Sequence, residues 1–255
     1  MGHTIAVSGK GGTGKTTFAA LIIRLLKMEK AGSILAIDAD PNSNLGEALG
    51  IRHVSTIVDI IDGISKNPAQ IPKGISKDRF IDLKIQESLD EEEGFDILSM
   101  GRPEGPGCYC FANNMLRGLI EKLMNNYDYV VIDNEAGMEH LSRRLVRKIN
   151  TLYIISDSSI IGVRSAARIS KLVDELDIEV KERSLVLNKS KGTAQTLEAE
   201  TEKSGLLVET VLPHDLEIEN VAIKSGSIFD LDTKNPVMNK VKELVSQHLH
   251  AGNTK

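Results

Sequence analysis

The sequence predicts an α/β fold: a mainly parallel, doubly wound sheet flanked by helices, built as a single domain over residues 1–255. Short apolar, β-branched runs alternate with amphipathic helical patterns along most of the chain, which is typical of βαβ units. The chain has 255 residues, 41% of them hydrophobic and 26% charged, which suffices for one large domain with a full core. No repeat, linker or low-complexity tract divides it.

The alternation begins with an apolar strand, a Gly-rich loop and a helix whose apolar residues recur at helical spacing. Further apolar runs of strand length predict the rest of the sheet. In chain order, the expected strands are 4–8, 33–38, 95–99, 129–133, 152–156, 184–188 and 206–212. The expected helices are 16–30, 57–61, 113–125, 163–176 and an amphipathic closing helix at 237–249.

Residues 63–94 interrupt this alternation with turns rich in Gly, Pro and Lys. Within them, the run from Phe80 to Ile85 alternates apolar and polar residues with a period of two. That period predicts an antiparallel edge strand on an inserted segment. The acidic run from Glu91 to Glu93 predicts a solvated turn.

The loop after the first strand carries a phosphate-binding motif. Residues Gly9 to Thr16 read Gly-Lys-Gly-Gly-Thr-Gly-Lys-Thr and fit G-x-x-x-x-G-K-[ST], the P-loop. Such a loop directs backbone N–H groups and a helix N-terminus at one point, which suits a polyphosphate. Lys15 is expected to reach the β- and γ-phosphates, and the Thr16 hydroxyl to bind Mg²⁺. The remaining residues expected to bind the nucleotide here are Gly11, Gly12, Thr13, Gly14 and Thr17.

A second lysine, Lys10, follows the first glycine of the motif. With it, the loop resembles the deviant Walker A motif of the SIMIBI ATPases, the class of MinD, ParA and the nitrogenase iron protein. In that class the extra lysine crosses a two-fold dimer interface and touches the nucleotide of the partner subunit. The resemblance implies a nucleotide-dependent homodimer. It also implies a catalytic role for Lys10, comparable to that of an arginine finger.

Carboxylates follow two of the predicted strands, where an open α/β sheet binds its ligands. Asp38 and Asp40 lie after the second strand, and the resemblance to switch I implies that Asp40 positions the attacking water and Asp38 lies on the Mg²⁺ side. By itself, such an Asp-x-Asp pair is also typical of a helix-capping turn. Asp133 opens a D-x-x-A-G segment similar to switch II, which implies that it holds Mg²⁺ through water.

Two residues near the ends of later strands predict the adenine site. Asn188, followed by Lys189, matches the base-reading Asn-Lys of the class, and its amide can both donate to adenine and accept from it. Pro213 matches the proline beside the base. The predicted cofactors are therefore ATP or ADP with Mg²⁺. The alternative for Asn188 is a plain turn residue.

The two cysteines of the chain are separated by a single residue, in the run Gly-Pro-Gly-Cys108-Tyr-Cys110. In an extended segment, residues i and i+2 point to the same face, so both thiolates can bind one metal ion. Two ligands do not complete a tetrahedral site, but a two-fold homodimer supplies four. Thiolates favour soft ions such as nickel or zinc, or an iron–sulfur cluster. The alternative is a pair of incidental buried cysteines.

With these cysteines and the run from Ala136 to Arg143, the chain resembles the CooC-type nickel-insertion ATPases. The resemblance extends over nearly the whole chain. The resemblance implies a metal, nickel or zinc, bound by Cys108 and Cys110 between two subunits. It also implies apo carbon monoxide dehydrogenase or acetyl-CoA synthase as the client. Glu139 and His140 match a Glu-His of that family and serve either metal transfer or a structural hydrogen bond.

Two other classes compete with this interpretation. A MinD- or ParA-like positioning ATPase needs a basic membrane helix or a DNA-binding surface, and the net charge of −5 and 4% aromatic content favour neither. An iron protein-like reductase takes its interface cysteines from separate segments, whereas this chain has one pair. With no apolar run of 18 residues and no room for a signal peptide, we expect a cytoplasmic protein without membrane or nucleic-acid partners.

Overall fold

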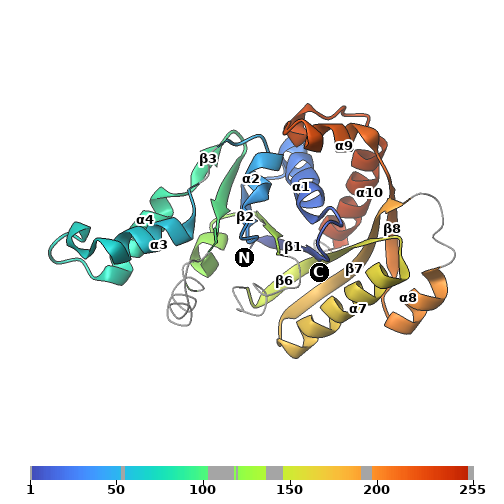
Figure 1. Ribbon diagram of the computed structural model, residues 1–255, viewed down its shortest axis with the longest axis horizontal. Coiled ribbons are helices and arrows are strands. Elements are labelled where there is room, and N and C mark those ends of the chain that lie inside the picture. The colour runs from blue at the N-terminus through green and yellow to red at the C-terminus, as the bar shows by residue number, and fades with distance from the viewer. Residues whose placement is uncertain are drawn as a thin grey trace.

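The computed structural model describes residues 2–52, 55–102, 118, 120–135, 146–190 and 197–251. Its centre is an eight-stranded sheet with the strand order β3-β4-β2-β5-β1-β6-β7-β8 (Figure 1). The strands are β1 (His3–Gly9), β2 (Ile34–Asp38), β3 (Asp90–Glu92), β4 (Phe95–Ser99), β5 (Tyr129–Asp133), β6 (Lys148–Asp157), β7 (Glu179–Ser190) and β8 (Val208–Pro213). The seven strands predicted from apolar runs are all present, and β1 lies in the interior between β5 and β6.

All strand pairs are parallel except the edge pair of β3 and β4, which is antiparallel. The fold class is therefore as predicted, but the position of the antiparallel strand is not. Residues 80–85 belong to a helix, α4 (Lys77–Glu87). Phe80, Ile81 and Ile85 are its buried residues, a spacing that puts them on one helical face. Ser76 caps the helix by accepting a hydrogen bond from the Arg79 N–H at 3.3 Å.

The antiparallel edge strand lies instead in the acidic run that predicted a solvated turn. Asp90, Glu91 and Glu92 pair with Ile97, Asp96 and Phe95. Gly94 makes the tight connection possible, because its φ of +86° is a conformation that other residues rarely adopt. The sequence signal for this hairpin was the glycine, not the side chains of the strand.

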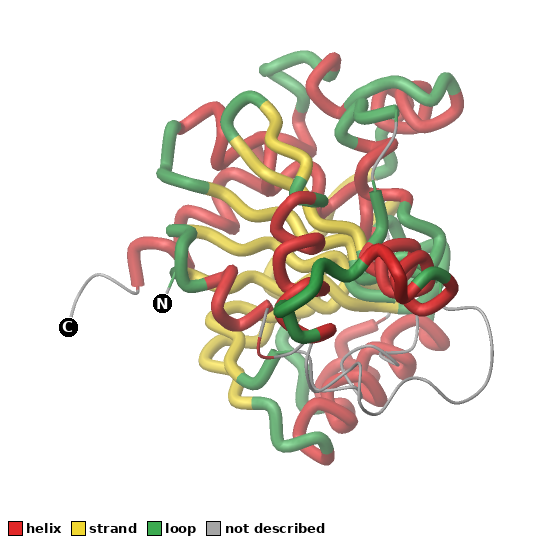
Figure 2. The backbone as a smooth tube through the Cα atoms, turned by 90° about the vertical axis from the view of Figure 1, so that its left-hand side faces the viewer, coloured by secondary structure: helices red, strands yellow, loops and turns green. Residues whose placement is uncertain are grey.

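Helices cover both faces of the sheet, each over its own apolar core (Figures 1 and 2). One face carries α1 (Lys15–Glu29), α2 (Asn44–Ala48), the 3-10 helix η3 (Ile228–Asp230) and α10 (Pro236–Ala251). The other carries α3 (Ile57–Lys66), α4 and α7 (Ile160–Glu175). The remaining elements are η1 (Pro68–Gln70), α8 (Glu198–Ser204) and α9 (Leu216–Ile223). Of the predicted helix 113–125, the last part, 120–124, is described and helical.

The closing helix α10 packs onto the core through Val237, Met238, Val241, Leu244 and Val245. It also reaches the exposed edge of the sheet, where the Lys240 ammonium donates a hydrogen bond to the carbonyl oxygen of Val211 on β8 at 3.0 Å. Within the described ranges, no helix combines the length and apolar character needed to cross a bilayer.

Candidate nucleotide site

The P-loop connects β1 to α1 at the carboxyl end of the sheet, and two of its glycines are required by close contacts. At Gly9, a Cβ atom would lie 2.3 Å from the carbonyl oxygen of Ile155 on β6. At Gly14, the φ of +92° is left-handed, and a Cβ atom would lie 2.5 Å from the Asn188 amide nitrogen. The loop is therefore seated directly against the ends of β6 and β7.

The carbonyl oxygen of Lys10 organises the turn from inside. It accepts a hydrogen bond from the Thr13 hydroxyl at 2.8 Å and one from the Lys15 ammonium at 3.4 Å. The Lys15 side chain is buried, so its charge is held in the concave side of the loop, where phosphates would bind. Lys10 itself is exposed, and its predicted reach toward a second subunit stays a prediction.

Asn188 and Lys189 hold the loop from the outside, a role that sequence reasoning missed. The Asn188 amide nitrogen donates to the carbonyl oxygen of Thr13 at 2.9 Å, and the Lys189 ammonium donates to that of Gly12 at 3.1 Å. The Asn188 amide oxygen accepts from the N–H of Lys189 at 2.9 Å. One amide hydrogen and one lone pair of Asn188 are left for the predicted contact with a base.

Asp38 is fully buried, and both its oxygens accept backbone hydrogen bonds. Oδ1 accepts from the N–H of Asp40 at 3.1 Å, and Oδ2 from the N–H of Leu45, in the first turn of α2, at 2.8 Å. Burial, followed by repulsion from Asp133, raises the pKa of Asp38 to about 7. The alternative prediction, a helix-capping turn, thus describes part of the role of Asp38, because its carboxylate binds the N–H of Leu45 in α2 and the N–H of Asp40 in the preceding loop. Its predicted place beside Mg²⁺ stays a prediction.

Asp133 is the register partner of Asp38 on the adjacent strand. It is 1% exposed, and within the described residues neither of its oxygens has a hydrogen-bond partner within bonding distance. Burial raises its pKa to about 6, although the nearby Thr16 hydroxyl and Lys15 charge lower it. A buried carboxylate left without a bond beside a P-loop threonine fits a hard cation that is ligated by oxygen. Thr16 and Asp133 are the residues that would hold Mg²⁺.

Asp40 lies in an Asx turn on the half-exposed loop between β2 and α2. Its Oδ1 accepts from both the backbone N–H and the side-chain amide of Asn42, each at 2.9 Å. These bonds orient the carboxylate without burying it, so water retains access. That position suits the predicted role of arranging a water molecule.

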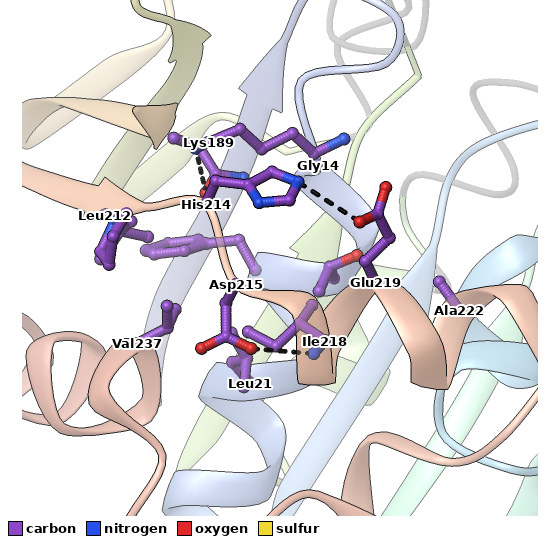
Figure 3. Close-up of a pocket in the computed structure, with 14 residues that line it drawn as sticks. Gly14, Leu21, Lys189, Leu212, His214, Asp215, Ile218, Glu219, Ala222 and Val237 are labelled. Atoms are coloured by element: carbon purple, nitrogen blue, oxygen red, sulfur yellow. Dashed lines mark hydrogen bonds and ion pairs between the residues drawn. The ribbon is translucent and has the colours of Figure 1, made fainter. Parts of the chain in front are cut away.

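Next to the P-loop lies a pocket of about 150 Å³, shown in Figure 3. Gly14, Thr17, Asn188 and Pro213 line it, so the structure brings together four residues predicted for the nucleotide. Phe18 and Leu21 of α1 and Leu212 and Val237 supply apolar walls, and α9 supplies Ile218, Glu219 and Ala222. The His214 ring faces the carboxylate of Glu219, 3.4 Å from Nε2 to Oε2. A pocket with apolar walls and a few polar groups suits a purine base.

The predicted metal site falls in the part of the chain that the structure does not describe. Cys108 and Cys110, as well as Glu139 and His140, lie outside the described residues. In the part of the chain that the structure describes, no group of three or more His, Cys, Asp or Glu side chains is arranged to hold a metal ion. The metal prediction therefore rests on sequence.

Comparison with known proteins places these features in a family. Residues 4–227 match the model of the CobQ/CobB/MinD/ParA nucleotide binding domain. The chain is 42% identical to an uncharacterized ATP-binding protein of Methanocaldococcus jannaschii over 246 residues, 95% of this chain and 97% of that protein. It is 30% identical to the carbon monoxide dehydrogenase accessory protein CooC of Rhodospirillum rubrum over 187 residues, 69% of this chain and 70% of that protein.

Solved structures agree on the fold. A ParA family ATPase from Chlorobium tepidum matches with a TM-score of 0.71 at 20% identity, covering 98% of this chain and all of that one. MinD of Pyrococcus horikoshii, complexed with Mg-ADP, matches with a TM-score of 0.70 at 18% identity, covering 97% of this chain and 96% of that one. At these identities the likeness concerns the fold alone, and it confirms the predicted fold class.

Proposed function

The chain belongs to the CobQ/CobB/MinD/ParA nucleotide-binding family, and on that premise we propose that it is an ATP-hydrolysing metallochaperone. Its cargo is a soft metal ion, nickel or zinc, and its client is apo carbon monoxide dehydrogenase or apo acetyl-CoA synthase. The single observation that carries this proposal is the Cys108-Tyr-Cys110 run, in a chain 30% identical to the CooC accessory protein.

The nucleotide half of the proposal has support from side-chain geometry. Lys15 is held inside the P-loop, and the bare carboxylate of Asp133 lies beside Thr16. Mg²⁺ bound there would neutralise charge on the phosphates. Asp40, oriented by Asn42 and open to water, arranges the water that attacks the γ-phosphate.

The metal half depends on a second copy of the chain. Two thiolates from each of two subunits would complete a tetrahedral site, and Lys10, which is exposed, would reach the nucleotide of the partner. In this mechanism ATP favours the closed dimer and with it the four-thiolate site, whereas hydrolysis opens the dimer and releases the metal to the client. The coupling is an equilibrium between two dimer states that nucleotide and metal both shift.

Metal stoichiometry tests the proposal. Anaerobic titration of the protein with Ni²⁺ or Zn²⁺ in the presence of a non-hydrolysable ATP analogue should saturate at about half an equivalent per chain. Cys108→Ser and Cys110→Ser should each abolish tight metal binding and keep ATP binding, because the P-loop is a separate site. One tightly held ion per monomeric chain would disprove the shared site.

Transfer to the client tests the chaperone role itself. Metal-loaded protein is mixed with apo carbon monoxide dehydrogenase and, separately, with apo acetyl-CoA synthase, and activation is followed with and without ATP. If the variant lacking both cysteines activates each client as well as the parent does, the metallochaperone proposal is wrong. The alternative, a MinD- or ParA-like positioning ATPase, is then favoured. The packing of α10 on the core argues against the membrane-bound form of that alternative.

A further inference from the structure

Helix α9 forms one wall of the pocket beside the P-loop, which we call the base pocket, and little of this helix is buried. None of the residues of α9 is buried, although Ile218, Glu219 and Ala222 face the pocket (Figure 3). The apolar contact of α9 with the core is made by Ile218, which is only half-buried. Hydrogen bonds at its first turn and in the segment that follows it supply further attachment.

At its first turn, α9 is tied to α10 by Asn235, which is buried. The Asn235 amide nitrogen donates to Asp215 at 3.1 Å and to Glu217 at 2.9 Å. Its amide oxygen accepts from the N–H groups of Val237 and Met238 in α10. This end of the helix is anchored to the body of the protein.

The segment after α9 is held by two further elements. The Ser227 hydroxyl donates to the carbonyl oxygen of Leu49 at 3.0 Å and accepts from the N–H of Phe229 at 3.2 Å. The buried guanidinium of Arg24 in α1 donates to the carbonyl oxygens of Ile228, at 2.8 Å, and Leu231. The segment from Ser227 to Leu231 is thus fixed to the P-loop helix on one side and to the end of α2 on the other.

The contact with α2 leads directly to the phosphate end of the site. Leu49 closes α2, whose Leu45 N–H is bonded to Asp38, and the other oxygen of Asp38 holds the N–H of Asp40. The approach is tight at the next residue as well. A Cβ atom on Gly50 would lie 2.8 Å from both Cβ and Oγ of Ser227. Between Ser227 and Asp40 there is one short helix and an unbroken series of hydrogen bonds.

We propose that Ser227 is a positioning residue that couples occupancy of the base pocket to the placement of Asp40. A base packed against α9 fixes the segment that follows it. Through Ser227 and Leu49 that segment then fixes α2 and the loop carrying Asp40. The base would raise the rate of hydrolysis in addition to contributing affinity. This inference rests on the ATPase half of the proposed function and does not involve the cysteines.

The experiment compares a substrate that has a base with one that has none. Steady-state hydrolysis of Mg-ATP and of Mg-tripolyphosphate is measured for the parent, Ser227→Ala and Gly50→Ala. The first variant removes the hydroxyl. The second displaces it from the opposite side and also strains the backbone, because the φ of Gly50 is +85°. We expect kcat for ATP to fall about tenfold in each variant with KM changed less than about twofold, and kcat for tripolyphosphate to stay within about twofold.

Two controls separate coupling from loss of structure. Ser225→Ala, two residues away, removes a hydroxyl for which the described structure shows no hydrogen bond, and should leave both rates unchanged. The double variant Ser227→Ala with Gly50→Ala should be no slower on ATP than the slower single variant, because both break one contact. Equal losses on both substrates would reduce Ser227 to a structural role and overturn the inference.

The outcomes for the parent protein distinguish the two proposals. A parent that binds ATP without hydrolysing it overturns the ATPase function and the coupling together. A parent that hydrolyses ATP no faster than tripolyphosphate, or variants that keep the parental ratio of the two rates, overturns the coupling and leaves the metallochaperone proposal intact.

Discussion

Asp38 and Asp133 are register partners at the carboxyl ends of β2 and β5, and both side chains are almost completely removed from solvent. Burial and, for Asp38, repulsion from its neighbour raise their pKa values to about 7 and about 6. At neutral pH the ligand-free fold therefore holds the charge of Asp133 beside an Asp38 carboxyl that is only partly ionised, which costs stability. A loss of stability of this kind is common at functional sites and is in line with the proposed Mg²⁺ site.

Asp133→Asn should stabilise the ligand-free protein at pH 8 by about 1–3 kcal/mol, because it removes a buried charge whose pKa is raised. A raised carboxyl pKa favours the fold at low pH and loses that contribution as pH rises through about 6. The gain should therefore vanish toward pH 4. Urea unfolding in EDTA at pH 4.5, 6 and 8 measures it, and a variant less stable than the parent at pH 8 would contradict it.

The comparison must be between variant and parent, because His3 has the opposite pH dependence. Burial lowers the pKa of His3 to about 4, so the fold loses stability as pH falls below the ordinary histidine value. Subtracting the two pH profiles removes this contribution. In the same variant, stabilisation of the fold by Mg-ADP over ADP alone should disappear.

Asp40→Ala should bind ATP with little change and lose turnover by about 100-fold or more, because a group that orients water contributes chiefly to the transition state. Asn42→Ala is the matched control, since it removes one of the bonds that orient Asp40 and keeps the carboxylate. Its loss should be smaller. Parental hydrolysis by Asp40→Ala would assign the water to another residue.

Lys10→Ala should fail to dimerise with a non-hydrolysable ATP analogue while still binding it. The deviant Walker A motif predicts that this exposed lysine touches the nucleotide of the second subunit. Light scattering of the nucleotide-bound protein measures the change in mass. Lys171→Ala, which removes an exposed lysine from α7, should dimerise like the parent. A stable dimer of Lys10→Ala would exclude this lysine from the interface.

Gly14→Ala should abolish nucleotide binding, because its Cβ atom would collide with the amide nitrogen of Asn188 that holds the loop. Gly74 offers a strict control. Its φ of +91° equals that of Gly14 within a degree, but no atom lies within 4 Å of its Cβ position. Gly74→Ala therefore carries the same backbone strain, about 1 kcal/mol, without the collision. Calorimetric titration with ADP should show binding in that variant alone.

Patterning of apolar residues was enough to predict the sheet. Six strands are interior or nearly so, and their continuous apolar runs are hard to mistake. The predicted edge strand was wrong, because Phe80 to Ile85 fits a period of two as well as it fits one face of a helix. The signal that favours the helix is the cap residue Ser76. Strand β3 consists of three acidic residues with no apolar pattern, so the only sequence signal for it is the turn residue Gly94.

Local motifs were enough to predict that Gly14, Thr17, Asn188 and Pro213 lie together, and these residues line one pocket, because a P-loop and the ends of parallel strands meet at one edge of the sheet. The motifs could not predict which side chains form hydrogen bonds with which backbone groups around the site. Asn188 supports Thr13, Ser227 supports Leu49, and Arg24 reaches Ile228 across 204 residues of sequence. Such contacts depend on how distant segments pack, which no local pattern records.

The hydrogen bond from Lys240 to Val211 has a consequence for how the protein behaves in a crowded solution. Strand β8 ends the sheet, and a bare edge strand invites a second molecule to extend the sheet, the usual start of aggregation. Here the Lys240 ammonium is bonded to the carbonyl oxygen of Val211 on β8. At the opposite edge, β3 has only three residues, all acidic, and their charges would repel the same strand of a second molecule. Polymerisation through sheet edges is thereby discouraged at both ends of the molecule.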